Sequence, residues 1–258
     1  MSILGMANLQ WNLTTIIGLF STIPVVISFI FSIIQYRKNR HHHELVMALS
    51  WLSCFCWLLT LSLSIIFMSK KVHLISILFQ IPLSIFIIIL TDIIHHDSIN
   101  PIKMSILLLI IGAIIILIVD EETIIEHTYP NGSRIFLTAG LKATFVFLLF
   151  YLNINFSILY LGIRIFLKSP AQLKRKAFGF LITGLLIGVG TPVINFLNLG
   201  ENMSIAMMSI FSIGIGLFTY AFISEPKLAF ILPYKVKSLI ILDRSEEHTS
   251  ELQSRQVI

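Results

Sequence analysis

The segment MSILLLIIGAIIILIV, residues 104–119, decides the class of this chain. It contains no charged side chain, and Asp120-Glu-Glu122 ends it abruptly. Such a run predicts a helix in the hydrocarbon core of a membrane, where a full crossing takes about 20 mostly apolar residues. Comparable apolar runs recur on both sides of it, so the sequence predicts a multi-pass membrane protein.

The composition of the whole chain agrees with this interpretation. Of its 258 residues, 56% are hydrophobic and 12% are charged, whereas ordinary soluble domains carry about 25% charged residues. A soluble globular domain and a disordered chain are therefore both excluded. We expect an all-α bundle of seven transmembrane helices, with spans at about Asn12–Gln35, Leu45–Met68, Val72–Ile94, Met104–Val119, Phe136–Phe166, Phe178–Leu199 and Met203–Ile223.

The positive charges predict the orientation of the bundle, because short cytoplasmic loops carry an excess of Lys and Arg. With the N-terminus outside, the outer loops hold only Lys70, Lys71 and Arg134. The inner loops then hold Arg37, Lys38, Arg40, Lys103, Lys168, Lys174, Arg175, Lys176, Lys227, Lys235 and Lys237. This asymmetry favours an N-out, C-in protein of the plasma membrane.

The net charge of +5 is therefore charge on the inner face. It favours contact with anionic lipids of the inner leaflet, and we expect no nucleic-acid partner. Residues 1–11 lack the basic start of a cleavable signal peptide, and we expect them to form a short outer tail.

The segment after the last span indicates a further domain. Residues 233–243 read PYKVKSLIILD, and the alternation at Lys235-Val236-Lys237 followed by an apolar run is typical of a first buried strand. We interpret residues 224–243 as a linker and the start of a cytosolic domain, with a segment lying at the membrane interface as the alternative. Residues 244–254 resemble the translation of a common DNA sequencing adapter, so 244–258 are excluded from the fold. The native protein is then expected to continue after about Asp243.

Histidines and carboxylates gather in the predicted inner loops. They are His41-His-His43 after the first span, and Asp92, His95 and His96 at the end of the third. Asp92 shares a helix face with His95 and His96, and imidazole with carboxylate is a donor set for zinc or iron. The alternative is that these residues are polar caps at the membrane surface.

Polar side chains inside the predicted spans are candidates for ligand binding. Lys142 either reaches the outer interface with its amine or pairs with an anionic ligand. The amides of the third, fifth and sixth spans either join helices by hydrogen bonds or line a pocket; they are Gln80, Asn153, Asn195 and Asn198. Asn195 and Asn198 follow the helix-distorting Thr191-Pro192.

Small residues recur four apart in the last two spans, at Gly184 and Gly188 and at Ser212 and Gly216. Such pairs let helices approach closely. We expect them to pack span six against span seven, with a homodimer interface as the alternative.

Seven spans, an N-out orientation and a short linker into the strand ending at Leu242-Asp243 resemble the seven-span sensor regions of prokaryotic histidine kinases and related membrane signalling proteins. The resemblance covers residues 12–243 and is architectural, so no site residues carry over from it. It implies an input module whose output domain follows the last span. Two alternatives stay open: a small-solute transporter or channel that uses the distorted spans, and a metal-dependent lipid enzyme that uses the inner histidines. No catalytic motif is found.

Overall fold

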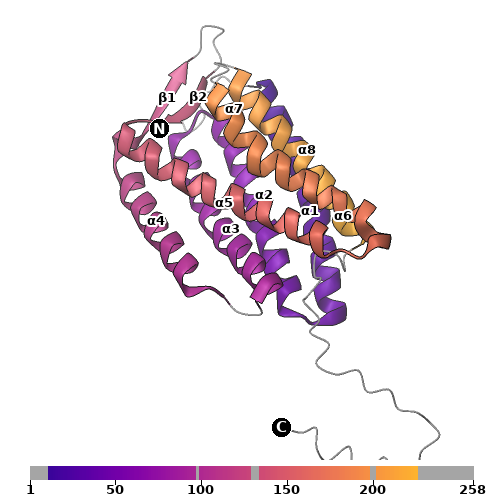
Figure 1. The fold of residues 1–258 in the computed structure, drawn as a ribbon. Coiled ribbons are helices and arrows are strands. Elements are labelled where there is room, and N and C mark those ends of the chain that lie inside the picture. The colour runs from indigo at the N-terminus through magenta and orange to yellow at the C-terminus, as the bar shows by residue number, and fades with distance from the viewer. Residues whose placement is uncertain (1–10, 97–98, 129–133, 198–201, 226–258) are drawn as a thin grey trace, which may run out of the picture.

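The computed structural model describes residues 11–96, 99–128, 134–197 and 202–225. Within these ranges seven helices are long and apolar enough to cross a membrane, as predicted, and they pack side by side in one bundle (Figure 1). This is the architecture of a multi-pass membrane protein. The first four helices are α1 (Leu13–Asn39), α2 (His42–Ile66), α3 (Lys70–His96) and α4 (Pro101–Val119). The fifth to seventh spans are α5 (Leu141–Lys168), α6 (Lys174–Leu185) continued by α7 (Thr191–Leu197), and α8 (Asn202–Ser224).

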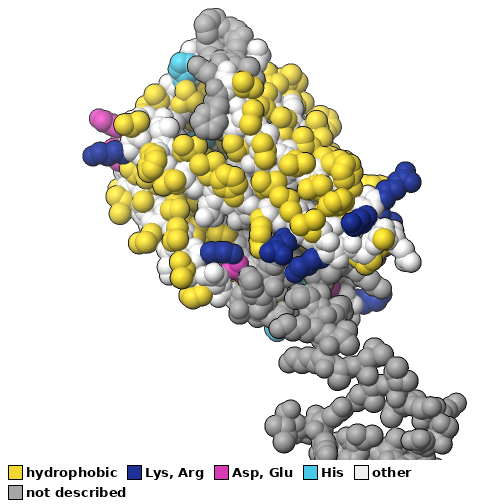
Figure 2. Space-filling model, viewed as in Figure 1, with side chains coloured by type: hydrophobic (Ala, Val, Ile, Leu, Met, Phe, Trp, Pro, Cys, Tyr) yellow, Lys and Arg dark blue, Asp and Glu magenta, His cyan; other side chains and the backbone are white. Residues whose placement is uncertain are grey.

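Charged side chains gather at the two ends of the bundle, and a broad apolar belt lies between them (Figure 2). The end that carries the α1–α2, α3–α4 and α5–α6 connections is called the basic end. Its described cations are Arg37, Lys38, Arg40, Lys103, Arg164, Lys168, Lys174, Arg175 and Lys176. The opposite end is called the hairpin end, and its described cations are Lys70, Lys71, Arg134 and Lys142.

Helices α1 and α4 each begin after an asparagine whose side chain satisfies backbone amides of the first turn. Asn12 caps α1, because its side-chain oxygen accepts a 2.8 Å hydrogen bond from the Thr15 amide. Arg40 ends the same helix in the left-handed conformation, with φ at 60°. Asn100 caps α4 by accepting from the amide of Ile102 at 3.0 Å, and Pro101 occupies the first turn, where no amide donor is required.

A β-hairpin stands at the hairpin end, in place of the predicted start of the fifth span at Phe136. Strands β1 (Ile124–Thr128) and β2 (Arg134–Thr138) pair antiparallel, and Glu126 forms a 3.0 Å ion pair with Arg134. Gly140, with a φ of 83°, separates β2 from the start of α5. The prediction that the fifth span begins at about Phe136 was therefore wrong, since α5 begins at Leu141, and this short hairpin is an addition to the predicted all-α bundle. The Phe136 ring instead packs on the His73 ring of α3, with 4.8 Å between centroids.

The core is divided into two clusters that share α3 and α5. The larger joins α1, α2, α6 and α8 around side chains such as Trp51, Phe180 and Phe222. The smaller joins α4 and β1 to α3 and α5 around Leu107, Ile114 and Phe150. The buried positions of α4 are Leu107, Ile111 and Ile114 alone, a single narrow stripe. This helix is therefore attached to the bundle along one face.

The sixth span is interrupted as expected near Pro192. A π-helical turn at Leu186–Gly190 precedes α7. Proline lacks an amide donor and its ring crowds the carbonyl four residues earlier, and a π-turn is one way to absorb that disruption.

We expected the small-residue pair of the sixth span to pack against the last span. In the structure, Gly184 and Gly188 pack against α5 instead. A Cβ added to Gly188 would lie 2.8 Å from the carbonyl oxygen of Asn155, and one on Gly184 would lie 3.2 Å from Leu159 Cα. Gly162 of α5 faces the backbone of Phe180 in return. In α8 it is Gly214 that meets the π-turn, at Ile187, whereas open space surrounds Gly216. A homodimer through Ser212 and Gly216 remains a prediction.

Replacing Gly162 tests this contact of α5 and α6. In Gly162→Ala the new methyl group meets the Phe180 carbonyl, which belongs to a helix and cannot rotate away, so we expect a loss of about 1–3 kcal/mol of unfolding free energy. Gly216→Ala is the matched control and should change stability by less than about 0.5 kcal/mol, since it faces open space. Unfolding in mixed detergent micelles, followed by tryptophan fluorescence, measures both. Equal effects of the two variants would contradict the close approach.

Candidate functional site

The α3–α4 connection at the basic end is organised by a buried carboxylate. The Asp92 side chain is fully buried, and its Oδ1 forms a 2.7 Å ion pair with Nζ of Lys103. Its Oδ2 accepts a 2.9 Å hydrogen bond from the amide of Asn100, the residue that caps α4. Asp92 thus holds the start of α4 against the last turns of α3 through both oxygens.

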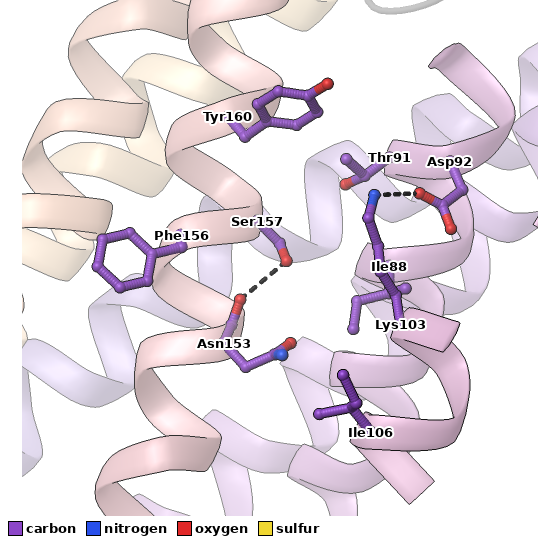
Figure 3. A pocket seen from close by; sticks show the side chains of 9 residues that line it. All are labelled: Ile88, Thr91, Asp92, Lys103, Ile106, Asn153, Phe156, Ser157 and Tyr160. Atoms are coloured by element: carbon purple, nitrogen blue, oxygen red, sulfur yellow. Dashed lines mark hydrogen bonds and ion pairs between the residues drawn. The ribbon is translucent and has the colours of Figure 1, made fainter. Parts of the chain in front are cut away.

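A cleft of about 490 Å³ lies beside this ion pair, between α3, α4 and α5 (Figure 3). The size lies within the range of small-molecule sites. Its walls carry apolar side chains together with polar groups from all three helices: Ile88, Thr91, Asp92, Lys103, Ile106, Asn153, Phe156, Ser157 and Tyr160. Half of the Ile106 side chain and 57% of Phe156 are exposed at the surface of the bundle, so the cleft opens sideways toward the surrounding membrane.

Two cations lie close to one aromatic ring at the basic end of the cleft. Nζ of Lys103 lies 5.9 Å from the ring centroid of Tyr160, and the guanidinium carbon of Arg164 lies 5.2 Å from the same centroid. Arg164 also donates a 3.2 Å hydrogen bond to the Tyr160 hydroxyl. Although Lys103 pairs with the buried Asp92, 46% of its side chain is exposed, so the ion pair lies at the surface of the cleft and not in the closed core.

The deeper part of the cleft contains an unsatisfied amide. The side-chain oxygen of Asn153 is buried and has no hydrogen-bond partner among the described residues, and the side chain points into the cleft (Figure 3). Ser157, one turn along α5, donates to the Asn153 backbone carbonyl at 2.8 Å. An unpaired buried amide is costly, so a ligand with a hydroxyl or an amide N–H would gain affinity there.

The carboxylate and the serine hydroxyl of this lining already have partners within the protein. The carboxylate is committed to a lysine and a backbone amide, and the serine hydroxyl is committed to its own helix. Among the described lining residues no nucleophile is paired with a base, which is the arrangement that covalent catalysis requires.

The predicted inner metal site stays a prediction. His41 and His43 stack with 5.1 Å between ring centroids at the α1–α2 connection. His95 and His96 end α3, and their side chains lie outside the described part of the structure. Within that part, no three His, Cys, Asp or Glu side chains come together as a metal site would need, and Asp92 uses its oxygens on α4.

The predicted ligand-binding residues lie in different places. Asn153 lines the cleft, whereas Gln80 accepts a 3.2 Å hydrogen bond from the Tyr151 hydroxyl and so joins α3 to α5. Lys142 is the second residue of α5 and is exposed at the hairpin end, away from the cleft. Asn195 belongs to α7, but its side chain, like all of Asn198, lies outside the described residues.

Sequence reasoning missed Lys103, Tyr160 and Arg164 as site residues. A signal for the first was present, because Asn100-Pro101 is a helix-start pattern and places Lys103 in the first turn of α4, opposite the last turns of α3. Nothing local in the sequence pairs Tyr160 with Lys103, because their approach depends on how α4 and α5 cross.

Comparison with known proteins finds no matching family model, no matching curated protein and no matching solved structure. The functional argument therefore depends on the geometry of the chain itself.

The ion pair gives a direct prediction. Asp92→Ala removes the partner of Lys103 and the acceptor of the Asn100 amide, and we expect it to lower the unfolding free energy by about 1–3 kcal/mol, less than for a fully buried pair because Lys103 is half exposed. Asp92→Asn combined with Lys103→Met should cost less than the sum of the single variants, by about 1 kcal/mol. Unfolding in detergent of the wild type, Asp92→Asn, Lys103→Met and the double variant measures the coupling free energy. Strict additivity would mean that the ion pair does not stabilise the contact between α3 and α4.

Proposed function

We propose that this chain is the input region of a membrane-bound signalling protein. In this proposal the bundle lies in the plasma membrane with the hairpin end outside and the basic end in the cytosol. An output domain follows α8 through the segment after Glu225. The predicted linker, residues 224–243, lies almost wholly outside the described residues.

The distribution of charge supports this orientation. The described cations at the basic end outnumber those at the hairpin end, as the positive-inside rule requires for a cytosolic basic end. The hairpin end carries the acidic residues Asp120, Glu122 and Glu126 instead. Because Asp and Glu contribute little to orientation, the argument depends on Lys and Arg.

The observation that carries the proposal is the way α8 is bound to its neighbours. Its Thr219 hydroxyl accepts a 2.8 Å hydrogen bond from Ser28 and donates to the Pro24 carbonyl at 3.3 Å, both in α1. On the other side, the Thr183 hydroxyl of α6 donates to the Gly214 carbonyl at 3.1 Å. The last helix before the predicted linker is thus joined by directional contacts to two helices.

The break in the sixth span adds a second support. Ile187 of the π-turn packs against Gly214 of α8, and π-turns occur frequently at functional sites. A change in the α6–α7 segment would therefore alter the environment of α8, which leads toward the predicted output domain. Signal transfer by small helix shifts of this kind is an established type of switching.

Cysteine labelling tests the orientation. In a chain with Cys54 and Cys56 replaced by Ser, we expect a membrane-impermeant maleimide to label Glu122→Cys in intact cells. It should label Arg175→Cys only after permeabilisation. Both positions are exposed at opposite ends of the bundle. The reverse pattern would overturn the N-out arrangement.

The signalling role is tested with the protein encoded by the complete locus. Sequencing genomic DNA past the codon for Asp243 should show the frame continuing into an output domain. In that protein, Thr219→Val removes one interhelical hydroxyl and should change basal output by about threefold, the effect of a typical hydrogen bond between membrane helices.

Tyr220→Phe is the control, because it removes a hydroxyl from the same helix at a side chain that is 72% exposed. Thr219→Ser should restore the basal output. A stop codon directly after Asp243 would overturn the signalling role and favour the transporter or lipid-enzyme alternatives. Equal outputs from Thr219→Val and Tyr220→Phe would contradict transmission through α8.

A further inference from the structure

We propose that the α3–α4–α5 cleft binds a single anionic amphiphile from the leaflet at the basic end, with its anionic head on Lys103 and its chain between α4 and α5. The inference concerns binding alone and stands whether or not the signalling proposal does.

The position of the cleft selects a ligand that arrives from the membrane. Its sideways opening is bordered by Ile106 of α4 and Phe156 of α5, whose side chains are largely exposed on the apolar belt. Its inner wall includes Ile88, which is 4% exposed. A hydrocarbon chain entering between α4 and α5 would contact all three side chains. A small polar solute would make no apolar contact with them.

The charge at the basic end of the cleft selects an anion. An ammonium group has three N–H donors, and Asp92 takes one of those of Lys103. The Arg164 guanidinium adds a second cation beside the same Tyr160 ring. Two cations against one carboxylate leave a net positive charge, which would attract a phosphate or carboxylate head and repel the choline of a zwitterionic lipid.

The spacing of the polar groups fits the order of groups in a lipid. Asn153 and Tyr160 are seven residues apart on α5, so they lie about 10 Å apart along the helix axis. The cations sit beside Tyr160, and the unsatisfied amide lies deeper in the membrane. An anionic head at Lys103 would therefore place the ligand's linker near Asn153 and its chain beyond. Phosphatidylglycerol probes the head and the chain, and a ligand with a hydroxyl or an amide N–H in its linker would also pair with the Asn153 oxygen.

The test measures lipid binding to the purified chain by native mass spectrometry in a non-ionic detergent. Phosphatidylglycerol should bind with one lipid per chain, and phosphatidylcholine should bind about tenfold more weakly, because its choline cation would lie beside Lys103 and Arg164 although its phosphate carries the same charge. Lys103→Gln should weaken phosphatidylglycerol binding by about tenfold, and Lys103→Arg should restore it.

Ile106→Trp supplies a second variant that fills the cleft and leaves the Asp92–Lys103 pair in place. It should abolish the one-to-one complex while thermal unfolding stays close to that of the wild type, because the position is half exposed. Lys176→Gln is the matched control, since it removes a cation from the basic end outside the cleft, and it should bind as the wild type does.

Three results would overturn the inference. Equal weakening by Lys176→Gln and Lys103→Gln would mean general attraction to a basic surface. Equal binding of phosphatidylglycerol and phosphatidylcholine would exclude selection for an anion. Competition by glycerol 3-phosphate at concentrations similar to those of the lipid would mean that the head group alone is bound and that the cleft takes no chain.

Discussion

The bilayer supplies no hydrogen bonds, and the rest of this structure depends on that constraint. Every backbone group in the apolar belt must be satisfied within the protein, which leaves helices as the building elements. Hydroxyl side chains in the belt follow the same rule, as when Ser32 and Thr191 donate to carbonyls four residues earlier in their own helices. The hydroxyls of Thr183 and Thr219 differ, because they form hydrogen bonds between helices at α8. The Asn153 oxygen of the cleft differs because it has no partner among the described residues.

The sequence predicted the helices well because apolar length alone decides them. It failed at Phe136, where an apolar residue follows the acidic loop and was taken as the start of a span. Phe136 packs on His73 at the helix ends, and hydropathy does not distinguish burial under a hairpin from burial in lipid. The partner of the Gly184 and Gly188 pair was also beyond the sequence, since small residues predict a close approach without saying which helix approaches.

The candidate site was predicted only in fragments. Asn153 was recognised as a polar side chain within a span, and Asp92 as part of the histidine and carboxylate set that ends the third span. From their shared helix face, Asp92, His95 and His96 were interpreted either as metal ligands or as polar caps at the membrane surface. The observed partner of Asp92, Lys103, lies on the next helix and was counted only as an inner-face charge. Local periodicity finds neighbours on one helix, whereas this cleft is made by three helices whose crossing is determined by packing.

The attachment of α4 connects the cleft to the rest of the bundle. A helix held by one apolar stripe and one ion pair is easier to displace than one buried on two sides, because fewer contacts must be broken. The opposite wall of the cleft is α5, and α5 meets α6 through glycines with backbone against backbone at Gly162 and Gly188. The atoms nearest these glycines are backbone atoms and the Cβ of Leu159, which the helix backbone holds in place, so they cannot move aside to absorb a shift. In the proposed sensor, an amphiphile that moves α5 relative to α4 would therefore act on α6 and its π-turn directly. The hydrogen bonds of Thr183 and Thr219 then join α8 to α6 and α1. Ligand binding and output would therefore be coupled through packed helices rather than through a loop.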